Sequence, residues 1–176
     1  MNDLPIAFQK VVDETKEWIK NVVIKHEFCP FAARPYFSQE IDYQIITKKD
    51  LPKFSKHFLK ELHSLNQSIK PETTLLIFPD SVEEFYVYLD LLQDTQDLLI
   101  EHDYEGIFQL ASFHPLYQFA GTTIEDVTNK TNRSPYPIIQ ILREDSISRA
   151  LKNYPNPEQI PQRNMIKAKE IFGKES

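Results

Sequence analysis

The histidine best placed for chemistry is His114, the first residue of an irregular segment over residues 114–137. It follows a run typical of a strand and precedes Pro115, which stiffens its backbone. An imidazole titrates near neutral pH, so His114 is a candidate catalytic residue, as a general acid, a general base or a single metal ligand. The alternative is a histidine that is only hydrogen-bonded into the loop.

Anion binding is the chemistry suggested by Asn132, Arg133, Ser134 and Arg143. A guanidinium presents a planar fork that fits a carboxylate or a phosphate. Arg133 and Arg143 are therefore expected to hold an anionic substrate, with Asn132 and the Ser134 hydroxyl beside them. The alternative is structural: Arg143 pairs with Glu144, and Arg133 binds loop carbonyls.

Cys29 is the only cysteine, so the chain has no internal disulfide, no zinc ribbon and no cysteine-ligated iron–sulfur cluster. It is a candidate catalytic nucleophile. However, it follows the end of a predicted helix, whose dipole raises the pKa of a thiol rather than lowering it. The alternative is a small buried apolar side chain between Phe28 and Phe31.

Two other kinds of site are excluded or not indicated. Three scattered glycines cannot build a P-loop or a dinucleotide-binding fingerprint. His57 and His63 share a predicted helix, but they are not one turn apart as paired zinc ligands on a helix are. No metal site is expected, and the cofactor is unknown.

Prolines adjoin aromatic residues in four segments: residues 29–31, 34–36, 114–117 and 134–137. Proline fixes φ, and each ring adds apolar area. Together these segments are expected to form a rigid, aromatic-walled pocket for a small ligand. Equally, they serve to pack loops against the sheet.

The elements that must position these residues alternate between strand and helix patterns. Helices are expected over residues 7–25, 51–65 and 81–102 and near the C-terminus, and strands over 43–47, 73–78, 107–113 and 138–142. Such alternation favours parallel strands joined by right-handed crossovers. We expect a single α/β domain over residues 1–176, with a three- to four-stranded, mainly parallel sheet flanked by helices. The carboxyl ends of the first three strands then share one edge of the sheet.

Charge and hydropathy exclude some partners. The formal charge is −6, with 11 basic and 21 acidic residues in 1–129 but 9 basic and 5 acidic in 130–176. There is no basic stripe interleaved with aromatic residues, so nucleic acid is not expected as a partner. No run approaches the roughly 20 apolar residues that cross a bilayer, and no apolar region typical of a signal peptide is seen. We expect a soluble, cytoplasmic protein.

The segment over residues 80–105 contains nine acidic residues and no Lys or Arg. Within the predicted helix, Glu83, Asp90, Asp94, Asp97 and Glu101 fall on one face. A solvated surface is one interpretation. The alternative is docking to a basic partner, including the positively charged C-terminal region of a second copy, which leaves a homo-oligomer open.

Several segments together resemble an uncharacterised bacterial family, domain of unknown function 1415: Trp18 with residues 29–32, then residues 109–115, 117–120, 131–137 and 142–146. The likeness extends from about Trp18 to Gly173, and Asn-Arg-Ser-Pro-Tyr-Pro is its most specific block. The family pattern has a histidine where this chain has Gln140, which argues against a mechanism that requires a histidine there. The resemblance implies no activity.

The residues favour the first of two functions, and the second is the alternative. In the first, the protein is a small-molecule enzyme with His114 as acid or base, Arg133 and Arg143 holding an anionic substrate, and Cys29 as a nucleophile. In the second, it is a non-catalytic ligand-binding or adaptor protein that docks a basic partner through the helix over residues 81–102.

Overall fold

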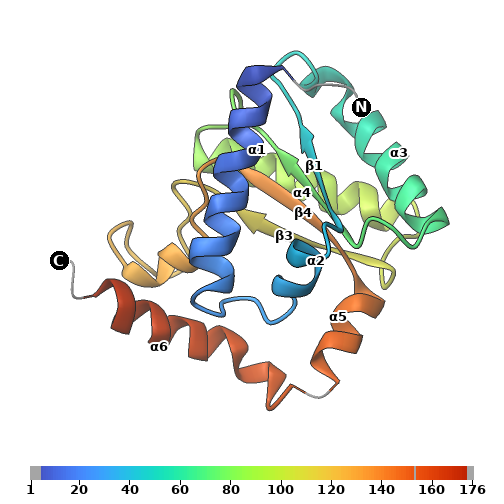
Figure 1. Ribbon diagram of the computed structural model, residues 1–176. Helices are drawn as coiled ribbons and strands as arrows, with labels where there is room; N and C mark the ends of the chain where they lie inside the picture. Colours follow the sequence, from blue (N-terminus) through green and yellow to red (C-terminus); the bar gives the residue numbers. More distant parts are fainter. Residues whose placement is uncertain (1–4, 153, 174–176) are drawn as a thin grey trace.

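The computed structural model describes residues 5–152 and 154–173 (Figure 1). The first four residues, part of the N-terminal sequence behind the signal-peptide expectation, lie outside this range. The helices are α1 (Ile6–Trp18), α2 (Ala33–Phe37), α3 (Phe54–Gln67), α4 (Phe85–Glu101), α5 (Glu144–Leu151) and α6 (Ile160–Phe172), and the strands are β1 (Ile41–Ile45), β2 (Thr73–Ile77), β3 (Phe108–Phe113) and β4 (Ile138–Arg143). In the part of the chain that is described, no helix is both long and apolar enough to cross a membrane.

The four strands form one sheet in the order β1-β2-β4-β3. Only β1 and β2 pair in parallel, whereas β4 pairs antiparallel with both β2 and β3. The expectation of a mainly parallel sheet is therefore wrong. The reason lies in the connection before β4: no long helix crosses back over the sheet between residues 114 and 137, and the irregular loop returns the chain in the opposite direction.

The first three strands still run in the same direction, so their carboxyl ends share one edge of the sheet. Contacts between the segments that follow them agree with this arrangement. The Lys48 N–H donates to Asp80 Oδ1 at 2.8 Å, and His114 Nε2 lies 3.1 Å from the Val82 carbonyl oxygen. Because β4 runs the other way, its carboxyl end, Arg143, lies at the opposite edge.

The sheet separates two apolar layers, as Figure 1 shows with α1 on one side and α3 and α4 on the other. The larger core packs α3 and α4 against one face and includes Phe58, Leu62, Leu76, Leu99 and Ile139. The smaller core packs α1 against the other face through Val11, Ile19, Leu75, Ile77 and Ile138. Alternate residues of β2 and β4 enter opposite layers, as the period of a strand requires.

The helix expected from residue 81 begins instead at Phe85. Ser81 does not act as a capping residue, since its buried hydroxyl has no hydrogen-bond partner among the described residues. Val82 has a φ of 50°, a strained conformation for a β-branched residue, and the backbone there cannot be part of an α-helix. The Val82 carbonyl contacts the ring of His114, which fixes the turn to the loop at the end of β3.

Tyr88 of α4 connects the larger core to the sheet. Its side chain is fully buried, and its hydroxyl donates to the Ile138 carbonyl at 2.7 Å while accepting from the Phe113 N–H at 3.1 Å. The two backbone groups belong to the paired ends of β3 and β4. One hydroxyl therefore satisfies two buried backbone groups at the end of the sheet.

Replacing Tyr88 by phenylalanine is expected to lower the free energy of unfolding by about 1–3 kcal/mol, because both backbone groups lose a partner inside the core. Urea unfolding followed by circular dichroism measures the change. Tyr86→Phe on the same helix is the control, since Tyr86 is 78% exposed and its change is expected to stay within about 0.5 kcal/mol. Equal effects of the two changes would contradict this assignment.

Candidate functional site

A pocket of about 540 Å³ lies on the sheet face that α1 covers. Its floor consists of alternate residues of the two central strands, Thr73 and Leu75 of β2 and Gln140 and Leu142 of β4. Gln140 Nε2 donates to Thr73 Oγ1 at 3.0 Å. The volume is that of a site for a small molecule.

One wall of the pocket is the C-terminal half of the first helical stretch. After Trp18 the helix widens into a π-helical segment, η1 (Ile19–Ile24), followed by hydrogen bonds such as Phe28 N–H to Val23 O, five residues back. Ile19 and Val23 of this segment line the pocket together with Trp18. Short π-helical segments are rare and frequently occur at functional sites.

The next wall is the proline–aromatic segment that follows this helix. Cys29, Pro30, Phe31 and Pro35 line the pocket. Two of the four segments expected to form it therefore do so, whereas residues 114–117 and 134–137 do not line it. The terminal helix α6 holds the start of the segment, since Asn164 Nδ2 donates to the Phe28 carbonyl at 2.7 Å. Lys167 of α6 also binds Glu27 Oε2 at 2.9 Å.

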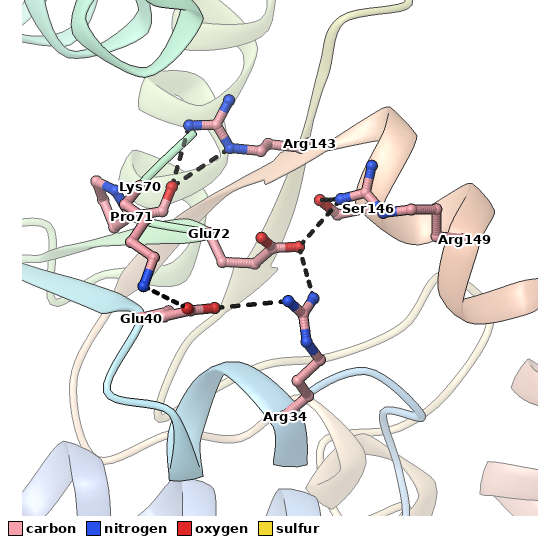
Figure 2. Close-up of polar contacts among 8 residues, drawn as sticks. All are labelled: Arg34, Glu40, Lys70, Pro71, Glu72, Arg143, Ser146 and Arg149. Carbon is pink, nitrogen blue, oxygen red and sulfur yellow. Dashed lines mark hydrogen bonds and ion pairs between the residues drawn. The ribbon is translucent and has the colours of Figure 1, made fainter. Parts of the chain in front are cut away.

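The third wall is α5, which contributes Ile147 and Ala150. Its Ser146 and Arg149 lie at the polar end of the pocket. Figure 2 shows this end, with Glu72 between Arg34 from α2 and Arg149 from α5. The pocket thus has an apolar body beside Trp18 and a charged end beside Glu72.

The ion pairs at the charged end are long. Arg34 Nη1 and Arg149 Nη2 each lie 3.6 Å from the same oxygen, Glu72 Oε1. Arg34 Nη2 also lies 3.8 Å from Glu40 Oε2, while Lys70 Nζ binds Glu40 Oε1 at 3.0 Å. Charge-assisted hydrogen bonds are normally about 2.7–2.9 Å long, so Glu72 holds the two arginines weakly. Arg149 has, in addition, a hydrogen bond from its Nη2 to Ser146 Oγ at 2.9 Å.

Arg143 also lines the pocket, but its donors are largely used. Its Nη2 donates to the Ser68 carbonyl at 2.7 Å and to the Pro71 carbonyl at 3.0 Å, and its Nε lies 3.3 Å from the same Pro71 oxygen (Figure 2). Burial lowers the pKa of the Arg143 guanidinium, although an arginine stays charged at any pH of interest. Arg143 therefore anchors the turn before β2 and adds positive charge to the pocket.

The Cys29 thiol faces conditions that favour its protonated form. Burial raises its pKa to about 11, and the N–H groups of Phe31 and Ala32, which favour the thiolate, offset only part of this effect. A thiol with this pKa is protonated at neutral pH, whereas the thiolate is the nucleophile. Cys29 thus forms part of the pocket wall as an apolar side chain.

Trp18 supplies a polar atom without a partner. Its ring packs edge-on against Phe113 with the centroids 5.1 Å apart. The indole Nε1 is buried and makes no hydrogen bond in the described part of the chain. An unpartnered buried N–H costs free energy in the folded chain.

His114 lies outside this pocket and is fully buried. Its Nδ1 accepts from the Leu116 N–H at 3.0 Å, so its Nε2 carries the proton and donates to the Val82 carbonyl. The rings of Phe85 and Tyr88 lie 5.3 and 5.0 Å from its ring. Burial lowers the pKa of His114, and the interactions with Val82 and Glu84 oppose that shift only in part.

The block Asn132–Ser134 also lies outside the pocket and binds backbone carbonyls. Asn132 Nδ2 donates to Ser112 O at 3.1 Å, and Arg133 donates from Nε to Tyr117 O and from Nη2 to Ile124 O. Ser134 Oγ donates to the carbonyl of Tyr136. These side chains bind the irregular loop to itself and to β3.

The six candidate residues therefore divide between the two edges of the sheet. His114 and the block Asn132–Ser134 adjoin each other, since the His114 N–H donates to the Asn132 carbonyl at 3.2 Å. Arg143 lies five residues along β4 from Ile138, the partner of Phe113, which is about 17 Å. Cys29 and Arg143 line the pocket, whereas the other four do not.

Three pocket residues, Arg34, Glu72 and Arg149, were not among the candidate binding residues. Arg34 belongs to one of the proline–aromatic segments, but Glu72 and Arg149 occupy unremarkable positions in the sequence. Their convergence depends on β2, α2 and α5 meeting at one edge of the sheet (Figure 2). The only available signal was that Arg34 adjoins Pro35 in a segment expected to line a pocket.

Two further expectations concern other surfaces. The five acids that the sequence places on one face, Glu83 just before α4 and Asp90, Asp94, Asp97 and Glu101 within it, are all exposed, and docking of a basic partner there stays a prediction. Among the described residues, no three His, Cys, Asp or Glu side chains form a group suited to a metal ion.

Comparison with protein-family models matches residues 10–175 to the family described as "Protein of unknown function (DUF1415)". No curated protein and no solved structure matches the chain.

The Cys29 thiol is expected to react slowly with iodoacetamide in the folded protein. A pKa of about 11 in place of 9.0 lowers the thiolate fraction at pH 8 by about 100-fold, and the rate should rise about tenfold per pH unit up to pH 10. Mass spectrometry of the alkylated chain measures the rate, with the urea-unfolded protein as the reference. A folded rate equal to the unfolded rate at pH 8 would contradict a buried, protonated thiol.

His114 is expected to make the free energy of unfolding depend on pH below about 7. The pKa of His114 is lowered in the folded state, so the unfolded chain binds the proton more readily. The stability that neutral His114 contributes is therefore complete above about pH 6.5 and is lost as the pH falls below that value. Thermal melts of the wild type and His114→Gln test this. The variant should be less stable than the wild type at pH 7.5 but should lose less stability on acidification. It should retain the pH dependence that is due to His26, because burial lowers the pKa of His26 as well. Parallel curves for the two proteins would show that His114 does not titrate in this way.

Proposed function

The chain belongs to the DUF1415 family, and we propose from the geometry of its pocket that it binds a small, mainly apolar molecule between α1, α5 and the sheet. The observation that supports this most is the pocket itself: a cavity of about 540 Å³ with mainly apolar walls, a floor in which Thr73 and Gln140 lie beside two leucines, and charged groups at one end. Sites for small molecules and cofactors usually have this composition.

Binding is preferred over catalysis because of the chemistry of the pocket wall. The thiol there, Cys29, has a raised pKa and is protonated at neutral pH. The candidate acid–base residue His114 lies at the other edge of the sheet with both ring nitrogens already hydrogen-bonded. A carrier, sensor or ligand-regulated protein needs neither group.

Rigid walls also favour a binding role. Pro30 and Pro35 restrict the backbone of the wall after α1, and α6 holds its start through Asn164. A site that is ordered before the ligand arrives loses less entropy on binding. The proposal keeps the cytoplasmic, bacterial setting expected from the sequence and a small molecule as the partner.

The experiment uses the neutral apolar fluorophore N-phenyl-1-naphthylamine. Trp18 is the only tryptophan and lines the pocket, so a bound fluorophore should accept energy from it and quench its emission. Ala150→Phe, which places a ring at the wall formed by α5, is expected to weaken binding at least tenfold. Ser148→Phe is the matched control, because Ser148 is an exposed residue of the same helix that does not line the pocket.

The two variants distinguish binding in the pocket from non-specific hydrophobic binding to the protein surface. Saturable quenching in the wild type and in Ser148→Phe, with loss in Ala150→Phe, supports the proposal. Absence of quenching in the wild type, or equal binding by both variants, overturns it.

A further inference from the structure

We propose that the ligand is an amphipathic monocarboxylate, and that its carboxylate binds Arg34 and Arg149 by displacing Glu72. This inference rests on the proposed function and adds the chemical class of the ligand. It depends on three observations: the charge balance at the polar end, the length of the ion pairs there and the dimensions of the apolar body.

The charge balance favours an anion. Four cationic groups gather around three carboxylates, which leaves one positive charge in excess: Arg34, Lys70, Arg143 and Arg149 against Glu40, Glu72 and Asp145. A cationic ligand would add to the excess of positive charge, whereas an anion reduces it. Electrostatic complementarity of this kind selects between ligands of similar shape.

Glu72 already occupies the place that a ligand carboxylate would take. Both arginines approach one oxygen, Glu72 Oε1, at 3.6 Å, and no hydrogen bond holds the Arg34 guanidinium among the described residues. An arginine can form two parallel hydrogen bonds of about 2.7–2.9 Å with a free carboxylate. A ligand that is not tied to the backbone can reach this geometry, while Glu72 is fixed next to the first residue of β2.

Both arginine side chains are exposed, and the one hydrogen bond that holds either of them among the described residues is from Arg149 Nη2 to Ser146 Oγ at 2.9 Å (Figure 2). The side chains of Arg34 and Arg149 are 68% and 63% exposed, and they lie on separate helices, α2 and α5. Arg143, in contrast, is held by the carbonyls of Ser68 and Pro71. The structure therefore supplies two exposed guanidinium groups for the carboxylate and one fixed cation beside them.

The floor of the pocket sets the length of the apolar part. From Glu72 to Leu75, a residue of the pocket floor, is three residues or about 10 Å. A ten-carbon chain with nine bonds spans about 10 Å, since three backbone bonds advance about 3.5 Å. With its head at Arg34 and Arg149, such a chain reaches Leu75.

The experiment compares decanoate, decanol and decyl phosphate at pH 7.5 by Trp18 fluorescence and calorimetry. Decanoate is expected to bind at least tenfold more tightly than decanol. Arg34→Gln and Arg149→Gln should each weaken decanoate about tenfold or more, the usual loss of a hydrogen bond to a charged group, and leave decanol unchanged. Lys49→Gln, an equal change of charge at the other edge of the sheet, is the control and should bind decanoate as the wild type does.

Glu72→Gln gives the sharpest test, because it is expected to strengthen decanoate binding whereas the two arginine variants weaken it. Removing the competing carboxylate should tighten decanoate binding severalfold, whereas a purely structural role of Glu72 predicts weaker binding. Thermal melting confirms that each variant is folded.

The outcomes distinguish the ligand class from the proposed function. Equal affinities for decanoate and decanol, tighter binding of decyl phosphate than of decanoate, or weaker decanoate binding by Glu72→Gln overturns the carboxylate inference while the pocket stands as a binding site. If neither the three compounds nor N-phenyl-1-naphthylamine binds to the protein, the proposed function itself is overturned.

Discussion

Strand β4 is hydrogen-bonded along both edges, to β2 on one side and to β3 on the other, and it runs antiparallel to both. Its position controls where the functional groups lie. Because the side chains of a strand alternate, β4 gives Ile139 and Ile141 to the core beneath α3 and α4, and Gln140 and Leu142 to the floor of the pocket. Because it runs against its neighbours, it ends with Arg143 at the edge where β2 begins.

The same constraint divides the polar residues into two groups with different tasks. At one edge, His114 and the block Asn132–Ser134 bind backbone groups of the long loop, and nearly every donor has an acceptor within the chain. At the other edge, Arg34 and Arg149 share one carboxylate oxygen at long range. Saturated hydrogen bonds hold a loop in place, while unsaturated charges beside an apolar cavity are suited to a ligand.

Much of the fold could be predicted from periodicity and composition. The buried run over residues 73–77 is β2, the apolar stripe through Phe58 and Leu62 is α3, and residues 138–143 form β4. Helix boundaries were less predictable where a tertiary contact decides them, as at Val82, whose carbonyl is held by His114 from a distant loop. The direction of β4 was not predictable, since an irregular connection can return a strand either way.

The sequence by itself determined the types of group available: one thiol, no glycine-rich phosphate loop, and proline–aromatic segments able to form a stiff pocket wall. It also identified the family, because the blocks that define it are local in the chain. Only the tertiary structure decided which groups meet. Glu72, Arg34 and Arg149 come from three separate segments and acquire a shared role only where these converge, whereas Arg143 and His114, 29 residues apart, are separated by the length of a strand. Ligand chemistry depends on distances in space, and these follow from strand direction rather than from spacing along the chain.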